Sequence, residues 1–344
     1  MANCERLAGT KRPAYRVARL WLTAALAIAP TASLASAQAS LDIPNALNTP
    51  PTEVVPRLDL PADAASARIE PDRQARPTLD VRIAGQGPFR FLVDTGAQST
   101  VVGRDLARQL ALPPAGRATL VATGSRQTVN LVEVSGLAFA DREMNLPAIP
   151  VLESTHLGAE GILGLDSLQG LRVLIDFREQ RIAVADPREE GNAGRYEIVV
   201  RARKRLGQII IADARVDGVR TAVIVDTGAV LSIGNPALLR RLRAKRQDDA
   251  QSTDVNGVTF ATDMRLAKRV TIGSMSIDQV PVGFADSPAF HALGLAGRPA
   301  LILGMSALGA LDRMAIDFAT RRVMFDLPRA VRRNGPGRRS SSAF

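Results

Sequence analysis

The chain has little of the chemistry on which many hydrolases depend. Its 344 residues include one cysteine, Cys4, and two histidines, His156 and His291. The single cysteine lies in the first few residues, so the rest of the chain offers neither disulfide bonds nor cysteine catalysis. Two histidines are too few for a histidine-based zinc site, and no acid cluster near them favours a metal site or a serine triad.

Aromatic residues are also scarce, at 4% of the chain. The formal charge of +10 comes mainly from the two ends, because residues 1–37 hold five basic residues and one acid, and residues 328–344 hold five arginines and no acid. The part between them is close to neutral. Nucleic-acid sites usually combine basic residues with aromatic ones. We therefore expect no nucleic-acid partner.

The first 37 residues have the features of a cleaved secretory signal. Basic residues between positions 11 and 19 precede an apolar stretch at 20–29, which Pro30 interrupts, and Ala35-Ser36-Ala37 is a cleavage signal of the A-x-A type. The apolar stretch is short for crossing a bilayer, although an uncleaved anchor is the alternative. The sequence thus predicts an exported protein, either periplasmic or secreted.

Two other segments differ in composition from the rest. Residues 38–77 hold seven prolines and show little apolar periodicity. We interpret them as an extended linker, with an inhibitory propeptide as the alternative. Residues 328–344 are interpreted as a basic, flexible tail with at most weak contact to the cell envelope.

Between these ends, short apolar runs alternate with Gly, Asp and Asn, which is typical of a β-rich body with few short helices. Three motifs occur twice in the same order, at offsets of 132, 140 and 141 positions. Such regular spacing indicates an internal duplication, with lobes at 78–190 and 191–327. The motif pairs are Asp94-Thr95-Gly96-Ala97 with Asp226-Thr227-Gly228-Ala229, Ile162-Leu163-Gly164 with Ile302-Leu303-Gly304, and Val173–Phe177 with Met314–Phe318.

Each Asp-Thr-Gly-Ala motif follows an apolar run, so it carries one carboxylate at the end of a buried strand. A duplicated fold can bring Asp94 and Asp226 face to face across a pseudo-twofold axis. Two carboxylates a few ångströms apart cannot both ionise easily, so they share one proton. The ionised one could then activate a water molecule while the protonated one donates to an amide carbonyl. This chemistry needs no metal, no cofactor and no covalent intermediate. The alternative is that both aspartates only cap turns.

The motifs resemble those of retropepsin-like (clan AA) aspartic proteases, in the bacterial form that fuses two copies in one chain. The resemblance covers about 78–327 and implies an all-β, bilobal fold with a pseudo-twofold axis. Asp94 and Asp226 would be the catalytic dyad, and Thr95 and Thr227 would interlock the two loops. The residues next to them would bind substrate, and the second motif would pack beneath the loops; these are Gly96, Gly228, Ala97, Ala229 and then Ile162, Leu163, Gly164, Ile302, Leu303, Gly304.

The resemblance also implies two flaps, which should be hairpins between the motifs. The candidate tips are Gly124-Ser125 and Asn256-Gly257, because glycine suits a mobile hairpin turn. Two further acids, Asp176 and Asp317, end strands and are predicted to be structural.

The predicted function is that of an aspartic endopeptidase for extended protein or peptide segments. It would act as a monomer whose lobes form an intramolecular pseudo-dimer. The alternative is a catalytically quiet protein that binds peptides or acts as a scaffold in the envelope. Ala97 and Ala229 cannot donate a hydrogen bond to a carboxylate, as Ser or Thr could. We therefore expect the dyad to hold its proton to higher pH than in pepsins, with activity from mildly acidic towards neutral pH.

Overall fold

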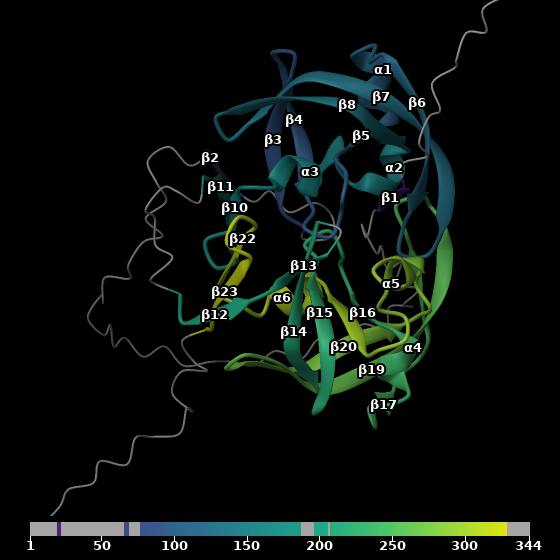
Figure 1. Ribbon diagram of the computed structural model, residues 1–344, viewed down its shortest axis with the longest axis vertical. Coiled ribbons are helices and arrows are strands. Elements are labelled where there is room, and N and C mark those ends of the chain that lie inside the picture. The colour runs from purple at the N-terminus through teal and green to yellow at the C-terminus, as the bar shows by residue number, and fades with distance from the viewer. Residues whose placement is uncertain (1–18, 22–64, 69–75, 187–195, 206, 329–344) are drawn as a thin grey trace, which may run out of the picture.

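A computed structural model describes residues 19–21, 65–68, 76–186, 196–205 and 207–328. Most of the predicted signal, most of the predicted linker and all but the first residue of the predicted tail lie outside these ranges. The described chain forms two lobes with a smaller sheet between them (Figure 1). This confirms the predicted all-β, bilobal fold. None of the helices within the described ranges has the length and apolar character needed to cross a membrane.

The first lobe is a strongly curved sheet. Its strands are ordered β1-β6-β7-β3-β4-β9-β5-β8, and β7 also pairs with β8, so the sheet closes on itself. The first of them, β1, pairs in parallel with β6; it lies within the predicted signal, so a chain cleaved after Ala37 would lack it. The bounds are β1 Arg19–Trp21, β3 Thr78–Ile83, β4 Gln86–Val93, β5 Val101–Gly103, β6 Pro114–Val121, β7 Arg126–Phe139, β8 Arg142–Leu152 and β9 Gly161–Leu163.

The second lobe repeats this arrangement. Its sheet runs β13-β14-β15-β21-β16-β20-β19-β17, with β14 also paired to β19, and β18 pairs with β19 beside that path. The central order β14-β15-β21-β16-β20 matches β3-β4-β9-β5-β8 in the first lobe. The bounds are β13 Arg203–Arg205, β14 Gln208–Val216, β15 Val219–Val225, β16 Ser232–Gly234, β17 Lys245–Arg246, β18 Ala250–Thr253, β19 Thr259–Ile272, β20 Met275–Phe284 and β21 Ala300–Leu303.

The helices of the described chain are short, with four to six residues each, and lie at the lobe margins. Two of them, α3 and α6, follow the Ile-Leu-Gly motifs and so occupy equivalent places in the lobes. The bounds are α1 Arg104–Gln109, α2 Ser154–Leu157, α3 Leu165–Leu168, α4 Pro236–Leu239, α5 Pro288–Ala292 and α6 Met305–Leu308.

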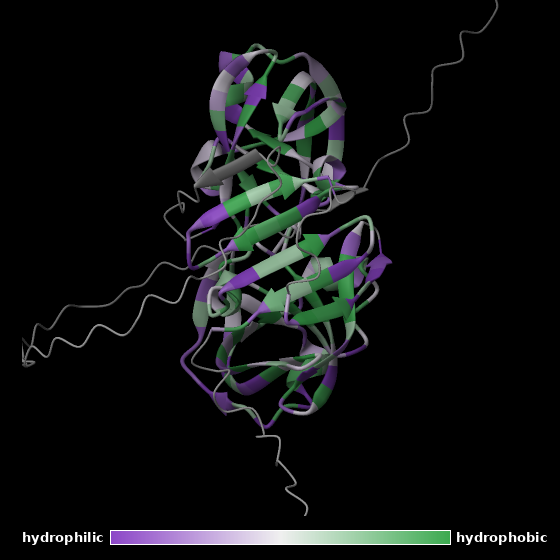
Figure 2. Cartoon of the chain, turned by 90° about the vertical axis from the view of Figure 1, so that its left-hand side faces the viewer, coloured by the Kyte–Doolittle hydropathy of each residue, from purple (hydrophilic) through white to green (hydrophobic). Residues whose placement is uncertain are grey.

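A third sheet joins the lobes, and the pseudo-twofold axis passes through it. Its order is β12-β23-β22-β10-β11-β2, and Figure 2 shows its strands crossing the middle of the molecule with apolar centres. In the antiparallel pair β10–β22, Leu174 lies opposite Ala315, which is its own counterpart in the second copy. The axis therefore passes between these two residues. The bounds are β2 Ala65–Arg68, β10 Arg172–Asp176, β11 Arg181–Ala185, β12 Ile198–Arg201, β22 Arg313–Asp317 and β23 Arg322–Asp326.

The strand β2 differs from the prediction for 38–77, which treated this stretch as linker. It pairs with β11 at one edge of the central sheet, as β12 pairs with β23 at the other edge. The run Ala-Ser-Ala-Arg alternates in polarity, but it is only four residues long and holds no β-branched or aromatic residue, so it gave no strand signal. The repeated unit thus begins before residue 78.

The apolar core explains how this scaffold holds the motifs. One large cluster runs through both lobes and the central sheet, and every residue of β10 is buried. Two smaller clusters lie directly behind the Asp-Thr-Gly loops; one contains Ala97 and the other contains Ala229. Asp176 and Asp317 accept backbone hydrogen bonds from Glu179 (2.7 Å) and Thr320 (2.8 Å), so both aspartates hold turns at strand ends.

Candidate active site

The two Asp-Thr-Gly-Ala loops begin where β4 and β15 end. Each of these strands is paired in parallel with the strand of an Ile-Leu-Gly motif, β4 with β9 and β15 with β21. The pairing continues into the loops, because the N–H of Asp94 donates to the carbonyl of Leu163 (3.1 Å) and that of Asp226 to the carbonyl of Leu303 (3.0 Å). The motifs predicted to lie beneath the loops therefore set the position of both aspartates.

Gly164 and Gly304 end these motifs because the loops pass too close for a side chain. A Cβ at Gly164 would overlap the backbone of Ser99, and one at Gly304 would lie 2.7 Å from the carbonyl oxygen of Leu231. Backbone contacts this short exclude any larger residue without movement of the loop. The glycine of each motif is thus explained by packing against the active-site loop.

Each loop fixes one oxygen of its own aspartate. In the first lobe the N–H groups of Gly96 and Ala97 donate to Oδ1 of Asp94, at 2.7 and 2.9 Å. In the second lobe Gly228 and Ala229 donate to Oδ1 of Asp226 at 2.9 and 3.0 Å. The carboxyl of Asp226 lies close enough to that of Asp94 to influence its pKa. The structure therefore brings together the two aspartates that stand 132 positions apart.

Thr95 and Thr227 connect the loops across the lobe boundary. The hydroxyl of Thr95 donates to the carbonyl of Val225 (2.8 Å) and accepts from the N–H of Thr227 (3.2 Å). The hydroxyl of Thr227 donates to the carbonyl of Val93 (2.6 Å) and accepts from the N–H of Thr95 (3.1 Å). Four reciprocal hydrogen bonds hold the two loops in one fixed relation.

Burial dominates the electrostatics of the pair. Asp94 and Asp226 have no exposed surface. Burial raises the pKa of Asp94 to about 6, although hydrogen bonds from Gly96 and Ala97, the charge of Arg76 and the neighbouring Asp226 all act in the opposite direction. Removing a carboxylate from water favours its neutral form, so this pair retains a proton at pH values well above those at which an aspartate usually ionises.

The remaining predicted loop residues contact the aspartates and their surroundings mainly through backbone atoms. The α-carbon of Gly228 lies against the carboxyl of Asp94, so that a Cβ there would overlap it. Ala97 and Ala229 belong to the apolar clusters behind the loops and contribute N–H groups to the aspartates. The carbonyls of Gly96 and Gly228 accept hydrogen bonds from the side chains of Gln208 and Arg76.

The two predicted flaps are hairpins whose tips meet. One is the β6–β7 hairpin, and the other is the β18–β19 hairpin; in Figure 1 the blue strands and the green strand approach each other along one side of the molecule. Oδ2 of Asp254 accepts from the hydroxyl of Ser125 (2.6 Å) and the N–H of Gly124 (3.2 Å). Nδ2 of Asn256 donates to the same Ser125 hydroxyl (2.8 Å). We call this set of three hydrogen bonds the flap clasp.

Both flap glycines lie against aromatic or imidazole rings of the other lobe. The ring of Phe260 covers Gly124, and the imidazole of His156 covers Gly257, so a Cβ at either glycine would overlap a ring. His156 therefore packs against the opposite flap. His291 lies at the surface beside Asp286, with Nε2 and Oδ1 2.7 Å apart. Nowhere in the described ranges do three potential metal ligands of the His, Cys, Asp and Glu types gather.

Sequence reasoning missed Arg76, Gln208 and Asp254. Arg76 and Gln208 each stand 18 residues before an active-site aspartate, so the duplication offset could have paired them. Nothing in either residue type suggested a role near a carboxylate pair. Asp254 lies in the predicted flap segment, but its bond to the opposite tip depends on the closed arrangement of two hairpins far apart in sequence.

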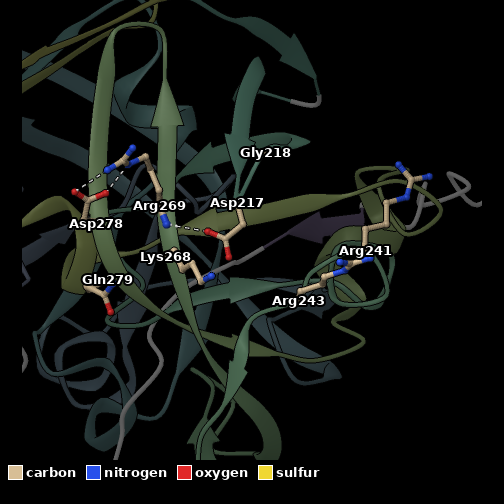
Figure 3. A pocket seen from close by; sticks show the side chains of 8 residues that line it. All are labelled: Asp217, Gly218, Arg241, Arg243, Lys268, Arg269, Asp278 and Gln279. Atoms are coloured by element: carbon tan, nitrogen blue, oxygen red, sulfur yellow. Dashed lines mark hydrogen bonds and ion pairs between the residues drawn. The ribbon is translucent and has the colours of Figure 1, made fainter. Parts of the chain in front are cut away.

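A groove away from the two aspartates carries no comparable chemistry. It is a groove of about 1050 Å³ on the second lobe, next to the β19–β20 hairpin (Figure 3). Its two acids, Asp217 and Asp278, are both engaged by Arg269, through a backbone bond of 2.8 Å and a side-chain bond of 2.6 Å. They cannot form a facing acid pair. The carboxylate pair of Asp94 and Asp226 is therefore the stronger candidate for catalysis.

Comparison with known proteins gives two matches. Residues 79–170 match the family model of gag-polyprotein aspartyl proteases, and residues 212–307 match a model described as aspartyl protease. Each match contains one Asp-Thr-Gly-Ala loop and the Ile-Leu-Gly motif that supports it. No curated protein matches the chain at a significant level.

Proposed function

The chain is a two-repeat retropepsin-like protein with two aspartyl protease domains in tandem, and from this premise we propose that it is an aspartic endopeptidase. The observation that carries the proposal is the pair of buried carboxyls, each fixed by two backbone N–H groups and joined through the threonine interlock. A rigid, water-poor carboxyl pair is suited to proton transfer at a scissile amide.

The reaction uses the single proton that the pair shares. The ionised carboxylate takes a proton from water as the water oxygen attacks the carbonyl carbon, and the other carboxyl gives its proton to the carbonyl oxygen. When the C–N bond breaks, the amine nitrogen takes the proton acquired from water, and the remaining carboxylate takes one proton back from the gem-diol. The products are a carboxylic acid and an amine, and the dyad ends with one proton, as it began.

The substrate class follows from the flaps. A segment between the clasped hairpins and the two loops has strand edges above it and backbone groups beneath it, which suits an extended polypeptide. The clasp links residues of both lobes, so it has to open before a segment can reach the dyad, and closure then excludes water. We propose protein or peptide segments as substrates and a monomer as the active species.

We further propose that the protein acts after export, in the periplasm or outside the cell, on the strength of the signal-like pattern in residues 1–37. The arginine-rich tail at 328–344 would add at most weak contact with the envelope. N-terminal sequencing of the secreted product should give a chain that starts at Gln38. A product that keeps the first 37 residues and stays with the membrane fraction would contradict this proposal.

The test of catalysis uses unfolded casein and two aspartate variants. Asp94→Asn keeps the size of the side chain but removes the shared proton, so we expect cleavage to fall to background. Asp213→Asn is the matched control, because Asp213 is exposed in the same fold and pairs with Arg220 at the surface (2.6 Å). Intact casein with the unsubstituted protein, together with stoichiometric binding of peptides, would favour the alternative of a catalytically quiet peptide-binding protein.

A further inference from the structure

The groove beside the β19–β20 hairpin of the second lobe is lined mainly by charged side chains (Figure 3). In Figure 3 the basic side chains come from two places, the strand β19 and the loop that follows α4. The charged residues that line the groove are Asp217, Arg241, Arg243, Lys268, Arg269 and Asp278.

The basic residues of the groove outnumber the acids, and one of them engages both acids. The side chain of Arg269 binds Asp278 (2.6 Å), and its backbone N–H donates to Asp217 (2.8 Å). The other three, Arg241, Arg243 and Lys268, are exposed and form neither a hydrogen bond nor an ion pair within the described ranges. Three positive charges therefore line this groove without a partner in the described chain.

The first lobe shows whether the fold itself needs these charges. The pairing of β19 with β14 and β20 repeats the pairing of β7 with β3 and β8 at an offset of 133 positions, and α1 and α4 begin 132 positions apart. These offsets give a counterpart for every charged residue of the groove. In chain order the counterparts are Ala84, Gln109, Ala111, Ser135, Gly136 and Asn145, and all of them are uncharged.

The backbone is nevertheless the same at the corresponding turns. The N–H of Asp217 donates to the carbonyl of Arg269 (2.9 Å), and in the first lobe the N–H of Ala84 donates to the carbonyl of Gly136 (3.0 Å). The loop after the helix differs in the same way, because five of the seven residues at 240–246 are basic, against one of the seven at 108–114. The fold does not require these charges, and a binding role explains why they gather around one groove.

The chemistry of the groove favours an acidic polypeptide as its occupant. Several carboxylates of one extended segment could reach the three basic side chains that have no partner. Asp217 and Asp278 lie among them and would repel a continuous row of phosphates, and none of the described lining residues is aromatic, so a nucleic acid would find no stacking surface. A membrane is flat on this scale and would not enter the hollow.

The strand β19 connects the groove with the flap clasp. It begins at Thr259, directly after the flap tip, and Lys268 lies nine residues further along it. At about 3.3 Å per residue, this part of the strand is about 30 Å long. An extended polypeptide of about ten residues covers the same distance, so one chain could occupy the flaps and the groove together.

We propose that this groove is a docking site for an acidic segment of the polypeptides that the protein binds. Its use in catalysis rests on the proposed function: a substrate would dock through acidic residues about ten or more positions away from the bond that is cut. The dyad would then perform the reaction, and the groove would select the proteins that stay bound long enough to be cut.

The binding test uses a fluorescent peptide in which glutamate and serine alternate, and a matched peptide with glutamine in place of glutamate. The double variant Arg243→Ala with Lys268→Ser gives the groove the residues of the first lobe, so the fold should tolerate both changes. Fluorescence anisotropy at physiological ionic strength measures the affinity. The affinity for the glutamate peptide should fall about tenfold, as expected for the loss of two exposed ion pairs.

The double variant Arg240→Gln with Lys245→Gln is the matched control. Both residues are exposed in the same basic loop and carry the same charge, but neither lines the groove. The control should keep the affinity within about twofold, because surface charges outside the groove are screened by salt. Equal losses in the two double variants would mean that net charge alone attracts the peptide, and would overturn the proposal. Equal binding of the two peptides, or binding of phosphatidylglycerol vesicles in place of the peptide, would also overturn it.

Cleavage measures the link between the groove and the dyad. A cleavable peptide that carries an acidic segment about ten residues from the cut bond, at either end, is compared with the same peptide without that segment. The groove variant should raise KM about tenfold for the first peptide only and leave kcat unchanged, because the groove does not contact the reacting bond. A KM that does not depend on the acidic segment would overturn the docking role. Peptide binding that is lost in the groove variant of a protein that never cleaves casein would uphold the docking site and refute the proposed function instead.

Discussion

The first lobe has Arg76 where the second has Gln208, and Asp166 where the second has Ser306. At the second of these places the backbone contacts are nevertheless the same in both lobes. The N–H of Asp166 donates to the carbonyl of Gln98 (3.2 Å), and that of Ser306 donates to the carbonyl of Val230 (2.8 Å). Side chains have diverged where the backbone performs the structural task.

Hydroxyl side chains agree between the lobes in the interlock and beside the glycine of each Ile-Leu-Gly motif. Thr95 and Thr227 form the reciprocal interlock, and Thr100 and Ser232 each accept from the N–H of the motif glycine through a hydroxyl oxygen (3.1 Å in both lobes). The two lobes thus share the geometry of the dyad and differ in the charges around it. Symmetric positioning is compatible with asymmetric electrostatics.

The largest effect is expected from substitution of the two aspartates, which tests whether they act as one unit although the charges around them differ. Asp94→Asn and Asp226→Asn should each lower kcat/KM by about a thousandfold or more, within the range for loss of a general acid or base. Because both groups serve the same proton transfers, the double variant should be no worse than either single one. Cleavage of a defined peptide, with Asp213→Asn as the control, measures this. Multiplicative losses would mean that the aspartates act separately.

The next effect concerns the stability of the interlock. Thr95→Val and Thr227→Val each leave a buried N–H of the opposite loop without its acceptor, so each should lower the free energy of unfolding by about 1–3 kcal/mol. The two losses should couple strongly in a double-mutant cycle, because each hydroxyl contacts the other loop. Urea denaturation monitored by circular dichroism measures both quantities.

Thr221→Val is the matched control for the interlock. Thr221 is equally buried, but its hydroxyl donates to the carbonyl of Val219 (2.8 Å) within the same strand. Its substitution should have a smaller effect and should not couple to either interlock residue. Additive losses for Thr95→Val and Thr227→Val would show that the lobes do not depend on each other through these hydroxyls.

The structural features that could be predicted from the sequence are mainly those whose residues occur in both copies of the duplication. The paired motifs predicted the bilobal β fold, and they identified the residues that the structure gathers at the dyad, since a duplication turns sequence distance into spatial symmetry. Apolar alternation predicted the core strands, because a strand with one buried face places an apolar residue at every second position.

Features that depend on a single copy, or on closure between distant hairpins, could not be predicted. Arg76 lies in a stretch interpreted as linker, and its role depends on a loop 152 positions away. The strand β2 has only four residues and no β-branched or aromatic side chain. The clasp between Ser125 and Asp254 exists only when two hairpins from different lobes meet, and no local pattern encodes that contact.

A smaller effect is expected when the flap clasp is weakened. Ser125→Ala removes the hydroxyl that bonds both Asp254 and Asn256, while Asp254 still accepts from Asn256 and Val258 within its own turn. The loss of hydrogen bonding worth about 1 kcal/mol should raise the open population of the flaps about fivefold. Hydrogen exchange at the two tips measures this, and Ser135→Ala, at an exposed serine of β7, is the control. Unchanged exchange would mean that the rings of Phe260 and His156 hold the flaps without the clasp.

The smallest effect, and the sharpest test of the comparison between lobes, comes from a hydroxyl added behind each aspartate. Burial keeps the pKa of Asp94 raised, to about 6, so the aspartate holds its proton in the folded protein over a range in which it is ionised in the unfolded chain. Its contribution to stability is therefore present at low pH and is lost as pH rises from about 4 through 6. Ala97→Ser would offer a hydrogen-bond donor that favours the ionised form of Asp94 and so lowers its pKa. The acid limb of the activity profile should then move down by about half a pH unit to one pH unit.

Ala229→Ser makes the same change beside Asp226, but its effect should differ if the first ionisation belongs mainly to Asp94. The acid limb reports the first ionisation, so it should move more in Ala97→Ser than in Ala229→Ser, and the basic limb should show the reverse order. Profiles of kcat/KM from pH 3 to pH 8 on one peptide measure both limbs. Equal shifts in the two variants would mean that the duplication has kept the dyad electrically symmetric, and a profile of the unsubstituted protein that peaks below about pH 3 would contradict the raised pKa itself.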